Sequence, residues 1–163
     1  MKLYTLVFRG IMGTLTILGR LRNWGWREYY RARGAFIGPS TYISPRAYID
    51  THRPGKVTIG RNCYITRNVV ILCHTDTRCG GSLRIWEKEG GKREFSDVSI
   101  GDNVFIGVNS VVMPGVTIGD NAIIGALTLV DKDIPEGKVA VGIPASIIGD
   151  TESHIIGNKK EDP

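Results

Sequence analysis

The sequence predicts an all-β fold, a parallel β-helix built from short stacked strands, and three observations predict it. Aliphatic residues recur every six positions, at Ile100, Ile106, Val112, Ile118, Ile124 and Val130. A small or β-branched residue follows most of them by four places, at Val104, Ser110, Val116, Ala122 and Thr128. Gly, Asn or Asp residues mark the turns between these hexads. Neither an amphipathic helix nor an alternating strand has this period, and units this short bury a core only by stacking as successive coils.

The first element along the chain is a basic, amphipathic helical segment, residues 1–34. It carries seven basic residues and one acidic residue, and its apolar residues from Leu3 to Leu18 follow helical spacing. Arg9 interrupts the apolar run, which is too short for a confident membrane span. Two interpretations stay open. One is peripheral contact with a membrane surface, for which a lipid-linked sugar would be a sensible acceptor. The other is a helix that caps the first coil or packs on a neighbouring subunit.

The other residues carry 14 basic and 15 acidic side chains, so their net charge is close to zero. The pI of 9.2 therefore gives no support to nucleic-acid binding. The cysteines, Cys63, Cys73 and Cys79, form no CxxC pair, and Cys63 occupies a small-residue position of the repeat. We expect Cys63 to be a reduced core thiol. No secretory signal with a cleavage site is evident, and these features predict a cytoplasmic protein, with membrane association left open by the first segment.

The repeat region extends over residues 35–149. Its register includes an upstream set of aliphatic residues: Ile37, Ile43, Ile49, Ile59, Ile65 and Ile71. A short insertion lies around residues 52–56, and a long excursion interrupts the register over residues 77–97. Three hexads make one triangular coil, so we expect about four coils. Long loops are usually functional, which draws attention to the excursion. Residues 150–163 form a polar tail that we expect to be poorly ordered.

Two stretches, VSIGDNVFIGVNSVVMPGVTIGDNAIIG and VDKDIPEGKVAVGIPASII, carry a family resemblance together with the histidine of ILCHTDT. They resemble the hexapeptide-repeat acyltransferases, most closely the maltose and galactoside acetyltransferases and the O-acetyltransferases of bacterial polysaccharides. The resemblance implies a left-handed winding, a homotrimer with active sites between subunits, and acetyl-CoA as co-substrate without a metal. The general rule for parallel crossovers favours the right-handed form, so the hand comes from the resemblance alone.

His74 is the candidate general base, because the catalytic histidine of the family stands at the matching place before the excursion. A neutral imidazole suits removal of a proton from a sugar hydroxyl as it attacks a thioester. Such a base needs an orienting partner, and the main candidate is Glu94, in the returning arm of the excursion, with Asp76 and Asp50 as alternatives. Asp50, Asp76 and Trp86 are candidate residues for the acceptor. His52 and His154 are expected to face solvent.

The donor site comes from the resemblance residue by residue. It assigns the thioester oxygen to the backbone N–H of Val108, an oxyanion-hole role. Gly107 permits close approach, Ala126 contacts the pantetheine arm, and Lys132 lies near the nucleotide phosphates. The remaining two positions are Phe105, where many relatives have tryptophan, and Pro144, in the turn that covers the groove. Leu127 and Asp131 depart from the family pattern, which makes the nucleotide contacts the weakest part of the assignment.

The residues leave other functions open. O-acetylation and N-acetylation of a sugar use the same base and donor, so the sequence does not separate them. A non-catalytic hexapeptide scaffold is the alternative from another class. A metalloenzyme of the γ-carbonic anhydrase type is not predicted, because the three histidines include no close pair in the sequence. Asp131-Lys132-Asp133 has a D-x-D pattern, which we interpret as an exit turn of the repeat.

Overall fold

The structure is a computed structural model that describes residues 23–76 and 93–156. Several predicted features lie outside these residues: the apolar run of the first segment, most of the excursion with Trp86, and the end of the polar tail. The described chain is mostly β, with parallel sheets and few helices. No helix in the two described ranges has the length and apolar character needed to cross a bilayer.

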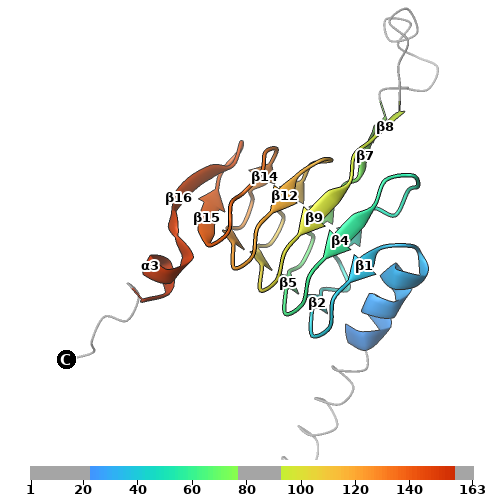
Figure 1. Cartoon of the computed structure of the whole chain (residues 1–163), viewed down its shortest axis with the longest axis horizontal. Coiled ribbons are helices and arrows are strands. Elements are labelled where there is room, and N and C mark those ends of the chain that lie inside the picture. Colours follow the sequence, from blue (N-terminus) through green and yellow to red (C-terminus); the bar gives the residue numbers. More distant parts are fainter. Residues whose placement is uncertain (1–22, 77–92, 157–163) are drawn as a thin grey trace, which may run out of the picture.

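Three parallel sheets form the sides of a stack of coils (Figure 1). Sheet A contains β1 (Phe36–Ile37), β4 (Val57–Ile59), β9 (Val98–Ile100) and β12 (Thr117–Ile118). Sheet B contains β2 (Tyr42–Ile43), β5 (Tyr64–Ile65), β10 (Phe105–Ile106), β13 (Ile123–Ile124), β15 (Lys138–Val141) and the antiparallel β16 (Ser146–Asp150). Sheet C contains β3 (Tyr48–Ile49), β6 (Val70–Ile71), β11 (Val111–Val112) and β14 (Leu129–Val130).

The six-residue register predicted from the sequence is confirmed. Strands β1 to β3 form one turn of the chain, which we call coil 1. Coils 2, 3 and 4 are β4 to β6, β9 to β11 and β12 to β14. Ile37 pairs with Ile59, and Ile59 with Ile100, so equivalent aliphatic residues stack above one another. All twelve register residues are at most 2% exposed, and together they form the core. The left hand of the winding stays a prediction from the family resemblance.

Two of the three corners in every coil are short turns, and most of their last-but-one residues have a positive φ. These residues are Ser40, Asn62, Asn68, Asn103, Asn109, Asn121 and Leu127. Asparagine tolerates this left-handed conformation better than other residues with a side chain. We call residues 38–41, 60–63, 101–104 and 119–122 the A/B corner, and residues 44–47, 66–69, 107–110 and 125–128 the B/C corner. The third, the C/A corner, follows the strands of sheet C and carries the insertion in coil 1 and the excursion in coil 2.

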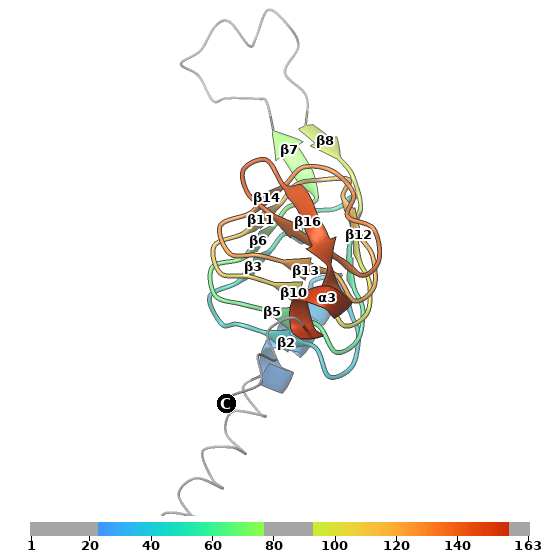
Figure 2. The ribbon, with the colours of Figure 1, turned by 90° about the vertical axis from the view of Figure 1, so that its left-hand side faces the viewer.

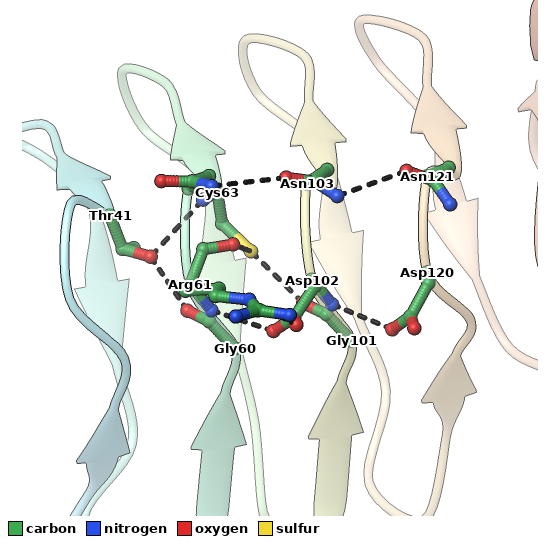
Figure 3. Close-up of polar contacts among 10 residues, drawn as sticks. Thr41, Gly60, Arg61, Cys63, Gly101, Asp102, Asn103, Asp120 and Asn121 are labelled. Carbon is green, nitrogen blue, oxygen red and sulfur yellow. Dashed lines mark hydrogen bonds and ion pairs between the residues drawn. The ribbon is translucent and has the colours of Figure 1, made fainter.

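At the A/B corner, polar side chains hydrogen-bond to the backbone and side chains of the neighbouring coil (Figure 3). The Asp102 carboxylate accepts hydrogen bonds from the Arg61 backbone N–H (2.9 Å) and the Arg61 Nε (2.7 Å). The Asp120 carboxylate accepts one from the Asp102 N–H at 2.7 Å. Asn103 donates to Asn121 Oδ1 at 3.0 Å. This ladder ties coils 2, 3 and 4 together along one edge of the stack.

A helix over residues 23–32 covers the open end of coil 1. Tyr30 is 6% exposed and its hydroxyl donates to the Ala47 carbonyl at 2.8 Å. Asn23 accepts from the Ile43 N–H, and Arg31 donates to the Ile37 carbonyl. The capping interpretation therefore holds for residues 23–32. The membrane interpretation depends on residues 1–22, which the structure does not describe.

The other end of the stack differs from the prediction of a poorly ordered tail. Residues Thr151–Ile156 form helix α3, which follows β16. Thr151 fixes its start, because its hydroxyl donates to the Asn121 carbonyl at 2.8 Å and its N–H to the Gly137 carbonyl at 2.8 Å. The sequence prediction used polarity alone and could not anticipate these two anchors.

Two short strands flank residues 77–92, and the sequence did not predict them. Strands β7 (His74–Asp76) and β8 (Arg93–Phe95) pair as an antiparallel hairpin, with His74 opposite Phe95 and Thr75 opposite Glu94. The hairpin projects from the C/A corner of coil 2 (Figure 2). His74 therefore lies at the root of the hairpin, where a rigid coil and the projecting ribbon meet.

Candidate active site

A buried carboxylate that is hydrogen-bonded to two histidine rings lies at the C/A corner. The Asp50 side chain is fully buried, and its Oδ1 lies 2.7 Å from His52 Nδ1. Its Oδ2 accepts a hydrogen bond from His74 Nδ1. The backbone N–H groups of His52 and Cys73 also donate to this carboxylate, at 3.0 and 3.2 Å. The His74 side chain is 17% exposed and that of His52 is 50% exposed, so both rings reach the surface from a buried anchor.

The coil length explains why these residues meet. Ile49 of β3 pairs with Ile71 of β6, so coil 2 repeats the positions of coil 1 after 22 residues. His52 and His74 have this same separation and therefore lie one above the other, with ring centroids 4.7 Å apart and the ring planes tilted by 51°. The expectation that His52 faces solvent is confirmed, because its side chain is 50% exposed. Its contact with Asp50 through Nδ1 was not predicted. The signal was present in the sequence as the 22-residue spacing of the first two coils.

The hydrogen bonds decide the state of the carboxylate. Burial raises the pKa of Asp50, but the hydrogen bonds from His52, His74 and Cys73 outweigh it and hold that pKa below its usual range. Asp50 is therefore ionised at neutral pH, and an ionised carboxylate only accepts hydrogen bonds. Each neutral imidazole must then carry its proton on Nδ1, which leaves Nε2 without a proton. A ring held in this way is a fixed general base.

Cys73 completes the packing under this corner. Its thiol is fully buried and donates to the backbone carbonyls of Asp50 and His52. Burial and the neighbouring Asp50 carboxylate raise the pKa of Cys73 to about 12, so the thiol stays protonated. Ligand-type atoms of Asp50, Cys73 and His74 lie within 4.8 Å of one another. A cysteine binds a metal as a thiolate, whereas here the Cys73 thiol stays protonated on two backbone carbonyls and both Asp50 oxygens are engaged by histidine rings.

The candidates from the excursion do not join this network in the described chain. Glu94 is exposed and lies opposite Thr75, whereas Phe95 lies opposite His74, with ring centroids 5.8 Å apart. Side chains alternate between the two faces of a strand, so Glu94 is on the face away from His74. Asp50 occupies the orienting position predicted for Glu94. The backbone of Asp76 ends β7, and Trp86 lies outside the described residues.

Four of the six predicted donor residues, Phe105, Gly107, Val108 and Ala126, lie at or next to the B/C corner. Sheet C separates this corner from His74. Phe105 is 40% exposed on β10, Val108 is 38% exposed, and Ala126 lies in the same corner one coil later. A Cβ on Gly107 would lie 2.5 Å from the Ala126 nitrogen, so only glycine fits there. No backbone hydrogen bond within the described chain uses the N–H of Val108 or of Ala126. These two amides therefore have no partner among the described residues, whereas the N–H groups of Arg61 and Asp102 at the A/B corner donate to carboxylates.

The last two donor candidates lie on different corners. The turn that contains Pro144 packs beside the B/C corner, because the Gly142 carbonyl accepts from the Leu129 N–H at 3.0 Å. Lys132 is exposed and follows β14, at the C/A corner. Next to it, Asp133 accepts a hydrogen bond from the Thr117 N–H at 2.7 Å, which gives this part of the D-x-D pattern a structural role.

Known proteins are similar to this chain in sequence and in fold. A family model described as "Bacterial transferase hexapeptide (six repeats)" matches residues 97–132. YvoF of Bacillus subtilis (strain 168) is 37% identical over 128 residues, 78% of this chain and 66% of YvoF. Nodulation protein L of Rhizobium meliloti (strain 1021) is 32% identical over 139 residues, 76% of this chain and 75% of that protein. The chain belongs to the hexapeptide-repeat transferase family.

A solved structure, galactoside acetyltransferase in complex with coenzyme A, is similar with a TM-score of 0.58 and 30% identity. The match covers 73% of this chain and 66% of that one. The chain thus spans slightly less than two thirds of both YvoF and this acetyltransferase. For this hexapeptide-repeat protein, the family match covers residues 97–132, which include every donor candidate except Pro144. Asp50, His52 and His74 lie before it.

Proposed function

We propose that the protein is an acetyltransferase that moves an acetyl group from acetyl-CoA to a hydroxyl of a saccharide, with His74 as the general base. The observation that carries this proposal is the hydrogen bond between His74 Nδ1 and the buried Asp50 carboxylate. It leaves Nε2 unprotonated on a ring that is partly exposed at the foot of the hairpin. The similarity to a coenzyme A complex supports the choice of donor.

The residues have separate roles in this reaction. His74 Nε2 takes the proton of the acceptor hydroxyl while the hydroxyl oxygen attacks the thioester carbonyl. The free N–H of Val108 stabilises the negative charge that develops on the carbonyl oxygen. The intermediate then expels the thiolate of coenzyme A, which takes the proton back from His74. Asp50 keeps its negative charge throughout, so it fixes the ring and stabilises the imidazolium. His52, on the other carboxylate oxygen, holds Asp50 in place.

We propose that the active site forms between subunits of a homotrimer. Within one chain the base lies at the C/A corner and the donor amides at the B/C corner, on opposite sides of sheet C. A ring of three copies brings the C/A corner of one subunit against the B/C corner of the next, because such an interface joins two different surface patches. The left-handed winding expected from the family fits this arrangement. Lys132, at the C/A corner, would meet the nucleotide phosphates from the subunit that provides the base.

The test is thiol release from acetyl-CoA with a panel of saccharides and amino sugars. We expect acceptor-dependent release that falls by about two to four decades in His74→Ala. Arg61→Gln is the control, because it changes another side chain of coil 2 at the A/B corner, away from both proposed halves of the site. Release with amino sugars alone would make the protein an N-acetyltransferase. If acetyl-CoA does not bind in calorimetry, the proposal fails in favour of a non-catalytic scaffold.

A further inference from the structure

A hollow of about 370 Å³ opens on coils 1 and 2, beside the B/C corner. Tyr42 and Tyr64 form one wall, with stacked rings 4.5 Å apart. Arg46 and Arg67 line it from the corner, and both side chains are exposed. The function proposed above uses no residue of this hollow.

The hollow continues the column that contains the donor candidates. Tyr64 pairs with Phe105 of the next coil, and their rings stack at 6.0 Å with an interplanar angle of 13°. The Asn109 N–H donates to the Arg67 carbonyl at 3.1 Å, which fixes coil 3 above coil 2 at this corner. Arg67 therefore stands in the same corner position as Val108, one coil lower. Neighbouring strands lie about 4.8 Å apart, so the base of Arg67 is one strand spacing from the proposed position of the thioester.

The charges at this corner have one sign. Residues 44–47, 66–69, 107–110 and 125–128 include two arginines and no carboxylate. In the described chain neither Arg46 nor Arg67 makes an ion pair, whereas Arg61 of the same coil is held by Asp102 at 2.7 Å. An arginine presents a planar fork of donors that matches a carboxylate in two hydrogen bonds. Two such forks beside an aromatic wall suit a sugar ring that carries an acidic group.

We infer that the hollow is an acceptor subsite for an acidic saccharide, in which Arg67, with Arg46, binds a carboxylate of the sugar. This inference rests on the proposed function, since it gives the chemical class of the acceptor. The position below Val108 assigns Arg67 to the acceptor side. The donor candidates lie in coils 3 and 4 or later in the chain. The proposed thioester position at Val108 therefore lies between Arg67 and the donor candidates of the later coils. The carboxylate binds at Arg67 while a hydroxyl of the same or the next sugar unit reaches the thioester.

The experiment is calorimetric titration of the full chain with trigalacturonic acid and with its neutral counterpart, galactotriose of the same linkage. We expect the acidic trimer to bind and Arg67→Gln to weaken it about tenfold or more. Arg67→Lys, which keeps the charge, should retain part of the affinity, and Arg61→Gln should bind as the wild type does. Affinity for the neutral trimer should be weaker in the wild type and should not change in Arg67→Gln.

Three results would overturn the subsite: equal affinity for both trimers, no binding of the acidic trimer at millimolar concentration, or loss of coenzyme A affinity in Arg67→Gln. The last result would assign the arginines to the donor phosphates. The titration does not require catalysis, so the two proposals fail separately. Arg67-dependent binding without thiol release would remove the proposed function and keep the subsite. Transfer to neutral saccharides at the same rate in the wild type and in Arg67→Gln would keep the proposed function and remove the subsite.

Discussion

At the scale of single residues, the proposed chemistry depends on the carboxylate of Asp50. It accepts hydrogen bonds from two imidazoles and two backbone N–H groups, all of them donors. An asparagine cannot accept from all four, because its amide nitrogen is itself a donor. The orientation of His74 should therefore be lost in Asp50→Asn while its imidazole remains.

Asp50→Asn should lower kcat for acetyl transfer by about tenfold to a hundredfold, with the KM for acetyl-CoA nearly unchanged, because the base is misoriented and the donor groove is not touched. Steady-state thiol release measures both constants. His52→Asn is the matched control, since it removes the other imidazole and leaves the His74 hydrogen bond. His52→Asn should lower kcat only about a few-fold. Wild-type kcat in Asp50→Asn would show that Asp50 does not position the base.

The lowered pKa of Asp50 also predicts a dependence of stability on pH. The unfolded chain takes up a proton near the ordinary value of about 3.9, whereas the folded protein takes it up at lower pH. The contribution of Asp50 to the free energy of unfolding is thus complete above about pH 4 and is lost as the pH falls through the folded pKa. Urea unfolding across this acid range should show a shallower fall in Asp50→Asn than in the wild type. Parallel curves would contradict this assignment.

At the scale of elements, the corners explain both the regularity of the coils and one irregular position. Five asparagines and one serine occupy the positive-φ position, and Leu127, with a φ of 57° and 61% exposure, is the exception. A leucine there has no hydrogen bond to offset the strain of the left-handed conformation. The strain lies in the same corner as the donor candidate Ala126.

Leu127→Asn should raise the free energy of unfolding by about 1 kcal/mol, because asparagine adopts this conformation at lower cost. Thermal unfolding provides the comparison. Asn109→Leu is the reverse control at the same corner one coil earlier, and it should destabilise by a similar amount plus the hydrogen bond from Asn68. A destabilised Leu127→Asn would mean that packing of the leucine side chain outweighs its backbone strain.

The elements also show what the sequence could and could not predict. The hexad register depends only on which side chains point inward, so Ile37 and the eleven residues equivalent to it could be predicted. The hairpin of β7 and β8 escaped prediction because strands of three residues give no reliable alternation. Asp50 was among the candidate residues, but the sequence could not select it over Glu94, because hydrogen bonds between coils are not visible in linear spacing. The usable signal in the sequence was the separation of His52 and His74 by 22 residues, the length of one coil, which places the two rings on the same corner.

At the scale of the whole molecule, the central claim is that one chain contains two halves of different active sites. The C/A corner holds the base, and the B/C corner holds the donor amides and the proposed acceptor subsite. Sheet C lies between them in every coil. Arg46 and Arg67 were not predicted from the sequence. The family resemblance predicted His74 and the donor residues as members of the two halves, and these roles stay predictions. The separation of the two halves needed the structure, because it depends on the side of the stack to which each turn belongs.

Complementation between two inactive variants tests this claim most directly. His74→Ala removes the base from the C/A corner, and Ala126→Trp fills the donor groove at the B/C corner without touching the core. Each variant alone should be inactive as a folded assembly. Co-expression in equal amounts should restore roughly a quarter of the wild-type activity per site, because in a closed ring a site is intact when its two halves come from the two different variants in the right order. Mixed assemblies without activity would place both halves of the site in one subunit and contradict the account.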